Sequence, residues 1–131
     1  MDEVDELAMG PMRYFAHDAD AALDPKCRRL IRQAGVAGYG RWWLLCEALA
    51  SEEGHEVGCA TPNDLMNLAV VLELDGPEEA REFLSLLQAI GLVQISGGCV
   101  SSKRMFENAR YFGRRRLNGK KGMKARWGKN R

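Results

Sequence analysis

Apolar residues recur every three or four positions in GYGRWWLLCEALASEEG, residues 38–54. This spacing places them on one side of an α-helix, and a glycine such as Gly54 commonly ends a helix. We predict a central core helix here, with Tyr39, Trp42, Trp43, Cys46 and Leu49 facing inward.

A shorter helix is predicted just before it, over about residues 25–33. Asp24-Pro25 suits the cap and the first position of a helix, and Gly35 suits its end.

Two further amphipathic helices are predicted downstream. Thr61-Pro62-Asn63-Asp64 has the composition of a helix start, and a second start lies at Pro77, where two glutamates suit the positive end of the helix dipole. Gly91 is the expected end of the second helix. The inward positions are Leu65, Leu68, Ala69 and Leu72 in the first helix, and Ala80, Phe83, Leu84, Leu87 and Ile90 in the second.

Short alternating segments predict a small amount of β-structure. HEVGCA, residues 55–60, is short enough for one small strand, and LVQISGGCVSS predicts a hairpin with strands near 92–95 and 99–101. Gly97-Gly98 is the turn signal between them. We therefore predict a mainly α fold with a small β-hairpin. The order helix, strand, helix, helix, hairpin is that of a winged helix-turn-helix, and a plain helical bundle ranks second.

The two ends of the chain differ from this body, which spans residues 14–102. Residues 1–13 lack periodicity and are predicted to be a flexible acidic arm. Residues 103–117 predict an amphipathic basic helix, and residues 118–131 predict a disordered basic tail or linker. Lys103, Glu107, Arg110 and Arg114 share one face of that helix, and Met105, Ala109 and Phe112 share the opposite one.

Charge is divided unevenly along the chain. Residues 1–100 hold seven Lys/Arg and 17 Asp/Glu, a net charge of −10, whereas residues 101–131 hold 12 Lys/Arg and one acid, a net charge of +11. An acidic body with a basic end indicates a polyanionic partner, with nucleic acid the first candidate. The alternative is that the basic end is only a solvated linker.

The basic end supplies the candidate nucleic-acid-binding residues. Cations would neutralise phosphates without reading sequence, and an aromatic side chain among them would stack on exposed bases. The candidates are Arg104, Arg110, Arg114, Arg115 and Arg116 on the helix, and Lys120, Lys121, Lys124, Arg126, Trp127 and Lys129 beyond it.

The predicted helix that starts at Pro77 has the wrong charge for DNA. In a DNA-reading winged helix it would enter the major groove. It carries Glu78, Glu79 and Glu82 against the single base Arg81. We predict that it does not read sequence and that the body meets protein instead.

Other chemistries find little support. His17–Asp20, HDAD, invites a metal or phosphohydrolase interpretation, but His55 is the only other histidine, so a local turn is favoured. His55 and Cys59 lack a second ligand pair, and no cysteine lies in a CxxC pair. No serine has a GxSxG context. We expect no enzymatic activity, no catalytic residue, no metal and no cofactor.

Neither a membrane span nor a signal peptide is predicted. No apolar run approaches the roughly 18 residues that a span requires, and the first ten residues, MDEVDELAMG, are acidic. We expect a cytoplasmic protein with no membrane partner.

Several short motifs stand in one register from residue 14 to about residue 104: Tyr14-Phe15, His17-Asp18, Asp24-Pro25-Lys26, Gly38-Tyr39-Gly40, Trp42-Trp43-Leu44-Leu45 and Ile90-Gly91-Leu92-Val93. Together they resemble the N-terminal domain of a largely uncharacterised bacterial and prophage protein family. That family is similar to the DnaD-type replisome organisers, which bind DNA and help bring the replicative helicase to an origin. NGKKG, from Asn118, resembles the basic linker that follows this domain.

The resemblance implies a winged-helix fold, DNA-linked work, self-association and a chain that continues past Arg131. It implies no catalytic residues. The leading hypothesis is therefore a non-enzymatic DNA-binding scaffold of a phage- or plasmid-type replisome organiser, with DNA and a helicase or its loader as partners. The second hypothesis is a protein-interaction and oligomerisation module with the tail only a linker. A winged-helix transcription regulator ranks third.

Overall fold

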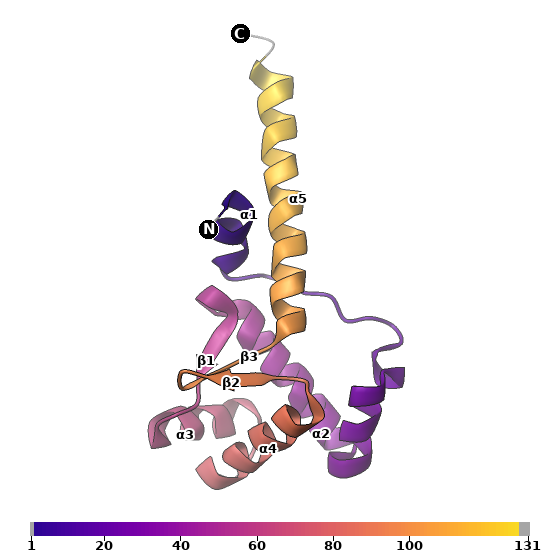
Figure 1. The fold of residues 1–131 in the computed structure, drawn as a ribbon, viewed down its shortest axis with the longest axis vertical. Helices are drawn as coiled ribbons and strands as arrows, with labels where there is room; N and C mark the ends of the chain where they lie inside the picture. The colour runs from indigo at the N-terminus through magenta and orange to yellow at the C-terminus, as the bar shows by residue number, and fades with distance from the viewer. Residues whose placement is uncertain (1, 129–131) are drawn as a thin grey trace.

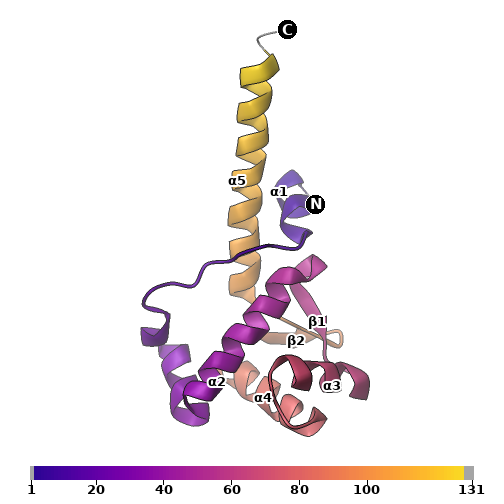
Figure 2. The same ribbon diagram turned by 180° about the vertical axis from the view of Figure 1, so that it is seen from behind.

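The computed structural model describes residues 2–128, and the side chains of residues 2–125. Helices α2, α3 and α4 and a small sheet form the body of the molecule (Figure 1). Helix α5 projects from this body, and the short helix α1 lies beside α5 in both views (Figures 1 and 2). Two short 3₁₀ turns, η1 (Ala21–Leu23) and η2 (Glu53–His55), flank α2.

Helix α2 spans Pro25–Ser51 and contains both of the first two predicted helices. The Asp24 carboxylate caps it by accepting hydrogen bonds from the Lys26 and Cys27 amides at 3.0 and 3.3 Å. Gly35 interrupts the helix with φ 72° and ψ −176°, a conformation that favours glycine, so the predicted break is present as a kink.

Helices α3 (Pro62–Val71) and α4 (Pro77–Ile90) form as predicted. Thr61 and Asp64 form a reciprocal capping box at the start of α3, and Gly91 ends α4 in the left-handed conformation at φ 97°. All nine predicted inward positions of these two helices are buried: Leu65, Leu68, Ala69, Leu72, Ala80, Phe83, Leu84, Leu87 and Ile90.

The three strands are β1 (Glu56–Gly58), β2 (Gln94–Ser96) and β3 (Cys99–Ser101), in the order β1-β3-β2. Both pairings are antiparallel. Gly97 and Gly98 both have positive φ, as a two-residue hairpin turn requires. The predicted mainly α fold with a small β-hairpin is confirmed, although β2 begins two residues later than predicted, after Val93 has entered the core.

The prediction of a flexible arm over residues 1–13 differs from the structure. Residues Glu3–Met9 form α1, with the Asp2 carboxylate accepting a hydrogen bond from the Asp5 amide at 2.8 Å. A helix this short is marginal alone in water. Packing on α5 supplies the missing stabilisation, and the segment it packs against lies more than 100 residues away in the sequence.

The predicted helix end near Leu117 also differs from the structure, in which α5 runs from Lys103 to Gly128. Once its first turns are held by the body, further residues add to an existing helix and carry no nucleation cost. Lys, Arg, Met and Ala are good helix formers, so they compensate for isolated glycines that cost about 1 kcal/mol each.

One hydrophobic core joins these elements. It draws residues from α2, α3, α4 and the sheet, together with Ala8 of α1 and Met105 and Ala109 of α5. Among residues 2–128, no helix is long and apolar enough to cross a membrane.

Candidate nucleic-acid interface

The first turns of α5 are fixed to the body. Ser102, almost completely buried, accepts a hydrogen bond from the Met105 amide through its hydroxyl at 3.3 Å. The Gln94 side chain of β2 accepts one from the Lys103 amide at 3.0 Å. Because Met105 and Ala109 are also buried, the helix leaves the body at a defined angle.

Helix α1 crosses α5 at Gly113. A Cβ atom at this glycine would lie 3.0 Å from the Val4 carbonyl oxygen and 3.2 Å from the Ala8 amide nitrogen. The absence of a side chain therefore permits the two backbones to approach closely.

Two predicted phosphate-binding arginines hold α1 instead. Arg110 forms an ion pair with Asp5, and Arg116 donates a hydrogen bond to the Leu7 carbonyl at 2.6 Å. Each arginine is three residues from Gly113, or about 60° to either side of the crossing point. They contact α1 on its two sides. The Arg110 charge is compensated by Asp5, whereas Arg116 keeps its charge and uses one N–H in a hydrogen bond to a carbonyl.

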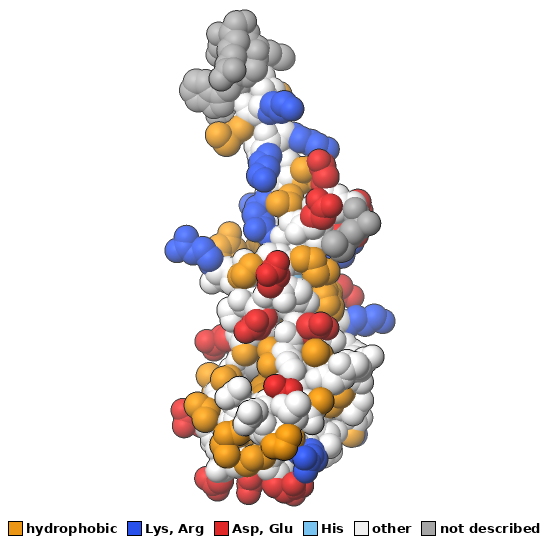
Figure 3. Space-filling model, turned by 90° about the vertical axis from the view of Figure 1, so that its left-hand side faces the viewer, with side chains coloured by type: hydrophobic (Ala, Val, Ile, Leu, Met, Phe, Trp, Pro, Cys, Tyr) orange, Lys and Arg blue, Asp and Glu red, His pale blue; other side chains and the backbone are white. Residues whose placement is uncertain are grey.

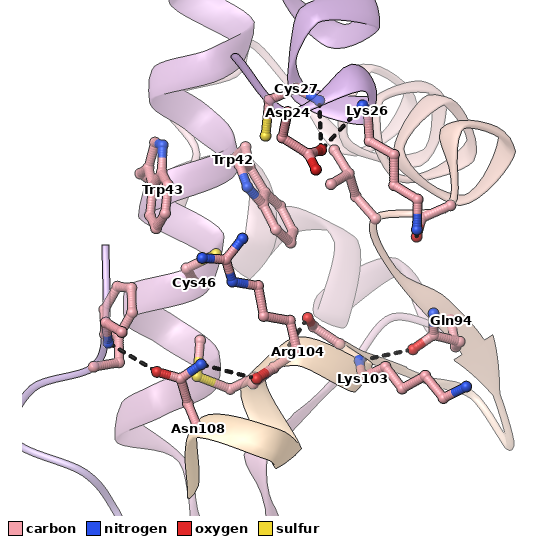
Figure 4. Close-up of a pocket in the computed structure, with 16 residues that line it drawn as sticks. Asp24, Lys26, Cys27, Trp42, Trp43, Cys46, Gln94, Lys103, Arg104 and Asn108 are labelled. Carbon is pink, nitrogen blue, oxygen red and sulfur yellow. Dashed lines mark hydrogen bonds between the residues drawn. The ribbon is translucent and has the colours of Figure 1, made fainter. Parts of the chain in front are cut away.

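Arg104 is likewise paired, with Asp18 of the segment before α2. Its guanidinium reaches toward the space between the Trp42 and Trp43 indoles (Figure 4). The three residues line a cavity of about 200 Å³ between α2 and the start of α5. Asn108 closes one side by accepting a hydrogen bond from the Ala16 amide at 2.9 Å.

The remaining predicted cations are exposed. Arg115 lies over the Tyr111 ring at 5.9 Å from its centroid. Within the described part of the chain, no ion pair involves these cations: Arg114, Arg115, Lys120, Lys121 and Lys124. Blue side chains follow the projecting helix in Figure 3, whereas red side chains are scattered over the body and beside the lower part of this projecting helix. The side chains of Arg126 and Trp127, and all of Lys129, lie outside the described residues.

Helix α4 presents the acidic surface that its sequence predicts. Glu78, Glu79 and Glu82 are exposed, and Arg81 forms an ion pair with Glu78 at 2.6 Å. The single basic residue of this helix is therefore compensated by its own neighbour.

The sequence predicted the cations of α5 but missed the residues that occupy some of them. Asp5 pairs with Arg110 and Asp18 with Arg104. Gly113 permits the close approach of α1 that brings Asp5 to the helix. A local signal for α1 did exist, since Asp2 and Asp5 have the spacing of a helix cap and Val4, Leu7 and Ala8 have helical spacing.

The two tryptophans of α2 have different environments. Trp42 is 3% exposed and belongs to the core, as predicted for an inward-facing residue. Trp43 is half-buried, and the His17 ring stacks on it with 3.5 Å between centroids and 9° between planes.

The buried thiols and imidazole have structural surroundings. Burial raises the pKa of the Cys46 thiol far above its ordinary value, and burial followed by the nearby Asp24 charge raises the pKa of Cys27. Both thiols are thus poor nucleophiles at neutral pH.

His55 is fully buried, with Nδ1 3.1 Å from the Leu49 carbonyl oxygen and Nε2 against that of Ala8. It connects the end of α1 to α2 and is not arranged to share a metal with Cys59. Among the described residues, no three His, Cys, Asp or Glu side chains converge as metal ligands.

No curated protein and no solved structure matches the chain. The profile of one protein family, described as Lin1244/Lin1753-like, N-terminal, matches residues 14–97. The match begins at Tyr14, where the motif register begins, and ends before α5. Because it covers more than half of the sequence, the chain belongs to the Lin1244/Lin1753-like family and contains its N-terminal domain.

Proposed function

We propose that this protein is a non-enzymatic DNA-binding scaffold of a phage- or plasmid-type replication system, related to the DnaD-type replisome organisers. The element order from α2 to β3, with β1 and β2 on either side of β3, supports a winged-helix body. In this proposal the body contacts protein, namely a second copy or a helicase or its loader, and the protein works in the cytoplasm.

One observation carries the DNA-binding part of the proposal: uncompensated cations are concentrated on a helix that projects from the body. Arg114, Arg115, Lys120, Lys121 and Lys124 are exposed on two to three turns of α5. Cations so placed neutralise phosphates and release counterions, which gives affinity without sequence information. Arg126, Trp127 and Lys129 extend the same basic run in sequence.

Salt titration of two chains tests the proposal. The full chain and a chain truncated after Leu117 are titrated with DNA at several salt concentrations. Engaging about six phosphates gives a slope of log affinity against log salt near −5 for duplex. Truncation removes six cations and leaves Arg114 and Arg115, so the slope should become about −2.

A chain truncated after Leu117 should keep the fold of the full chain, so that a change in DNA affinity reports on the removed cations alone. Gly113 and Arg116 keep their contacts with α1, and the described residues beyond Leu117 are exposed. The urea midpoint of the truncated chain should therefore match that of the full chain. Equal DNA affinity and an equal salt slope for both chains would show that the basic end is only a linker.

A second candidate function rests on the surface of α3. Met66, Val70 and Val71 are 47%, 69% and 42% exposed, so this helix presents apolar side chains to solvent. Such a patch favours a protein-interaction and oligomerisation module. Light scattering should give a dimer or larger mass that Val70→Glu reduces, and this function replaces the first if neither chain binds DNA. A transcription regulator is less favoured, because α4 is acidic.

A further inference from the structure

The His17 ring stacks on the indole of Trp43. The two rings are nearly parallel, with 3.5 Å between their centroids. His17 is exposed and belongs to the irregular segment between α1 and η1. Among the described residues its ring makes no hydrogen bond and contacts Trp43 by stacking.

The next residue places an anion on the first arginine of α5. Asp18 forms an ion pair with Arg104, and both side chains remain substantially exposed, at 57% and 42%. An ion pair this open to solvent contributes little stability. A ligand that carries an aromatic ring and an anion can therefore replace both contacts of the His17-Asp18 dipeptide.

An aromatic ring and an anion on adjacent units are what a nucleotide offers. We propose that Trp43 and Arg104 bind one nucleotide of single-stranded DNA, the base on Trp43 and the phosphate on Arg104, and that His17-Asp18 occupies this site in the free protein. The proposal rests on the proposed function, since Arg104 begins the helix that carries the phosphate-binding cations.

The surroundings of the two residues suit such a ligand. Trp43 and Arg104 line the same cavity of about 200 Å³, with Lys26 and Lys103 also in its lining. Duplex DNA is excluded, because its bases are stacked on one another.

While the dipeptide is in place the site cannot bind. The apparent affinity is therefore the intrinsic affinity of the open site multiplied by the fraction of molecules in which the site is open. Opening the site should raise affinity for single strands and leave duplex binding unchanged. The opened variant is His17→Ala with Asp18→Asn. Its control is Asp20→Asn, which removes one exposed acid two residues away that makes no ion pair among the described residues.

Fluorescence anisotropy of a labelled oligothymidylate and of a labelled duplex measures both affinities. We expect the opened variant to bind the oligothymidylate about fivefold to thirtyfold more tightly, and the duplex within about twofold of the wild type. Adding Arg104→Gln to the opened variant should abolish the gain. The indole N–H resonance of Trp43, assigned with Trp43→Phe, should shift when the oligothymidylate binds the full chain.

The outcomes separate this site from the proposed function. An opened variant no tighter than Asp20→Asn, with the steep salt slope of the full chain retained, overturns the site alone. A gain of equal size for duplex also overturns it, because an unstacked base is then not needed. Free thymidine monophosphate that competes as well as the oligothymidylate shows a mononucleotide pocket and overturns the strand-binding role. Absence of DNA binding by every chain overturns the proposed function with it.

Discussion

Helices α4 and α5 present exposed surfaces of opposite charge. Helix α4 follows α3 and would be the recognition helix of the proposed winged-helix body, yet its exposed face carries Glu78, Glu79 and Glu82. Helix α5 lies outside the three-helix body and carries exposed cations, among them Lys120, Lys121 and Lys124. If the body is a winged helix and the protein binds DNA, as proposed, the order of the elements alone does not indicate which helix meets DNA. The sign of the exposed charge is the better guide, since cations supply most of the affinity.

A second contrast lies within α5 itself. Three of its arginines, Arg104, Arg110 and Arg116, contact acidic or carbonyl groups of the N-terminal segment. Its second half carries Lys120, Lys121 and Lys124 without such partners among the described residues. The number of cations in a helix is therefore larger than the number available to a ligand.

The largest expected effect is on DNA affinity and comes from removing exposed lysines in the second half of α5. Changing Lys120, Lys121 and Lys124 together to Gln should make the salt slope shallower by about 2.7 and weaken binding by two to three orders of magnitude at about 0.1 M salt. The measurement is the anisotropy titration of duplex DNA. Glu78→Gln with Glu82→Gln on α4 is the control and should change affinity by less than about threefold. An unchanged slope in the lysine variant would remove α5 from the interface.

The contact between α1 and α5 gives the next effect, on stability. Gly113→Ala places a methyl group against the Val4 carbonyl and the Ala8 amide. Backbone atoms move less readily than flexible side chains, so overpacking should lower the free energy of unfolding by about 1–2 kcal/mol after the gain in helix propensity. Urea denaturation followed by circular dichroism measures it.

A second glycine of α5 is the matched control for this change. Nothing lies within 4 Å of a Cβ built at Gly119. Gly119→Ala should therefore raise helicity and cost no stability, because alanine is favoured over glycine by about 1 kcal/mol in a helix. Equal destabilisation by both changes would show that α1 does not pack at Gly113.

A smaller effect is expected from the ion pair that occupies Arg110. Asp5→Asn frees this arginine and should steepen the salt slope by at most about 0.9, one further phosphate contact. Glu6→Gln removes the same charge from the same helix at an exposed position and is the control. Equal slopes for the two variants would place Arg110 outside the interface even when free.

Local signals predicted much of the body. Thr61 and Asp64, Gly91, and the Gly97-Gly98 pair each act within a few residues, so the sequence alone placed two helix ends and one turn. The docking of α1 was missed because it depends on Gly113 and Arg116, more than 100 residues away. Long-range pairing is also why all the arginines of α5 were predicted as equivalent. Their separation into paired and free sets exists only once Asp5 and Asp18 have been brought to the helix.

The smallest expected effect is the one that separates α4 from α5 most directly. Arg81→Ala and Arg114→Ala each remove one exposed arginine, the first from α4 and the second from α5. Arg81 is paired with Glu78 on an acidic face, so its loss should change DNA affinity by less than about twofold and leave the salt slope unaltered. Loss of Arg114 should make the slope shallower by about 0.9 and weaken binding about eightfold at 0.1 M salt, if it contacts one phosphate. Parallel titrations of the two variants measure both quantities. Should Arg81→Ala change the slope as much as Arg114→Ala does, α4 would lie against the phosphate backbone, as the corresponding helix does in a DNA-reading winged helix.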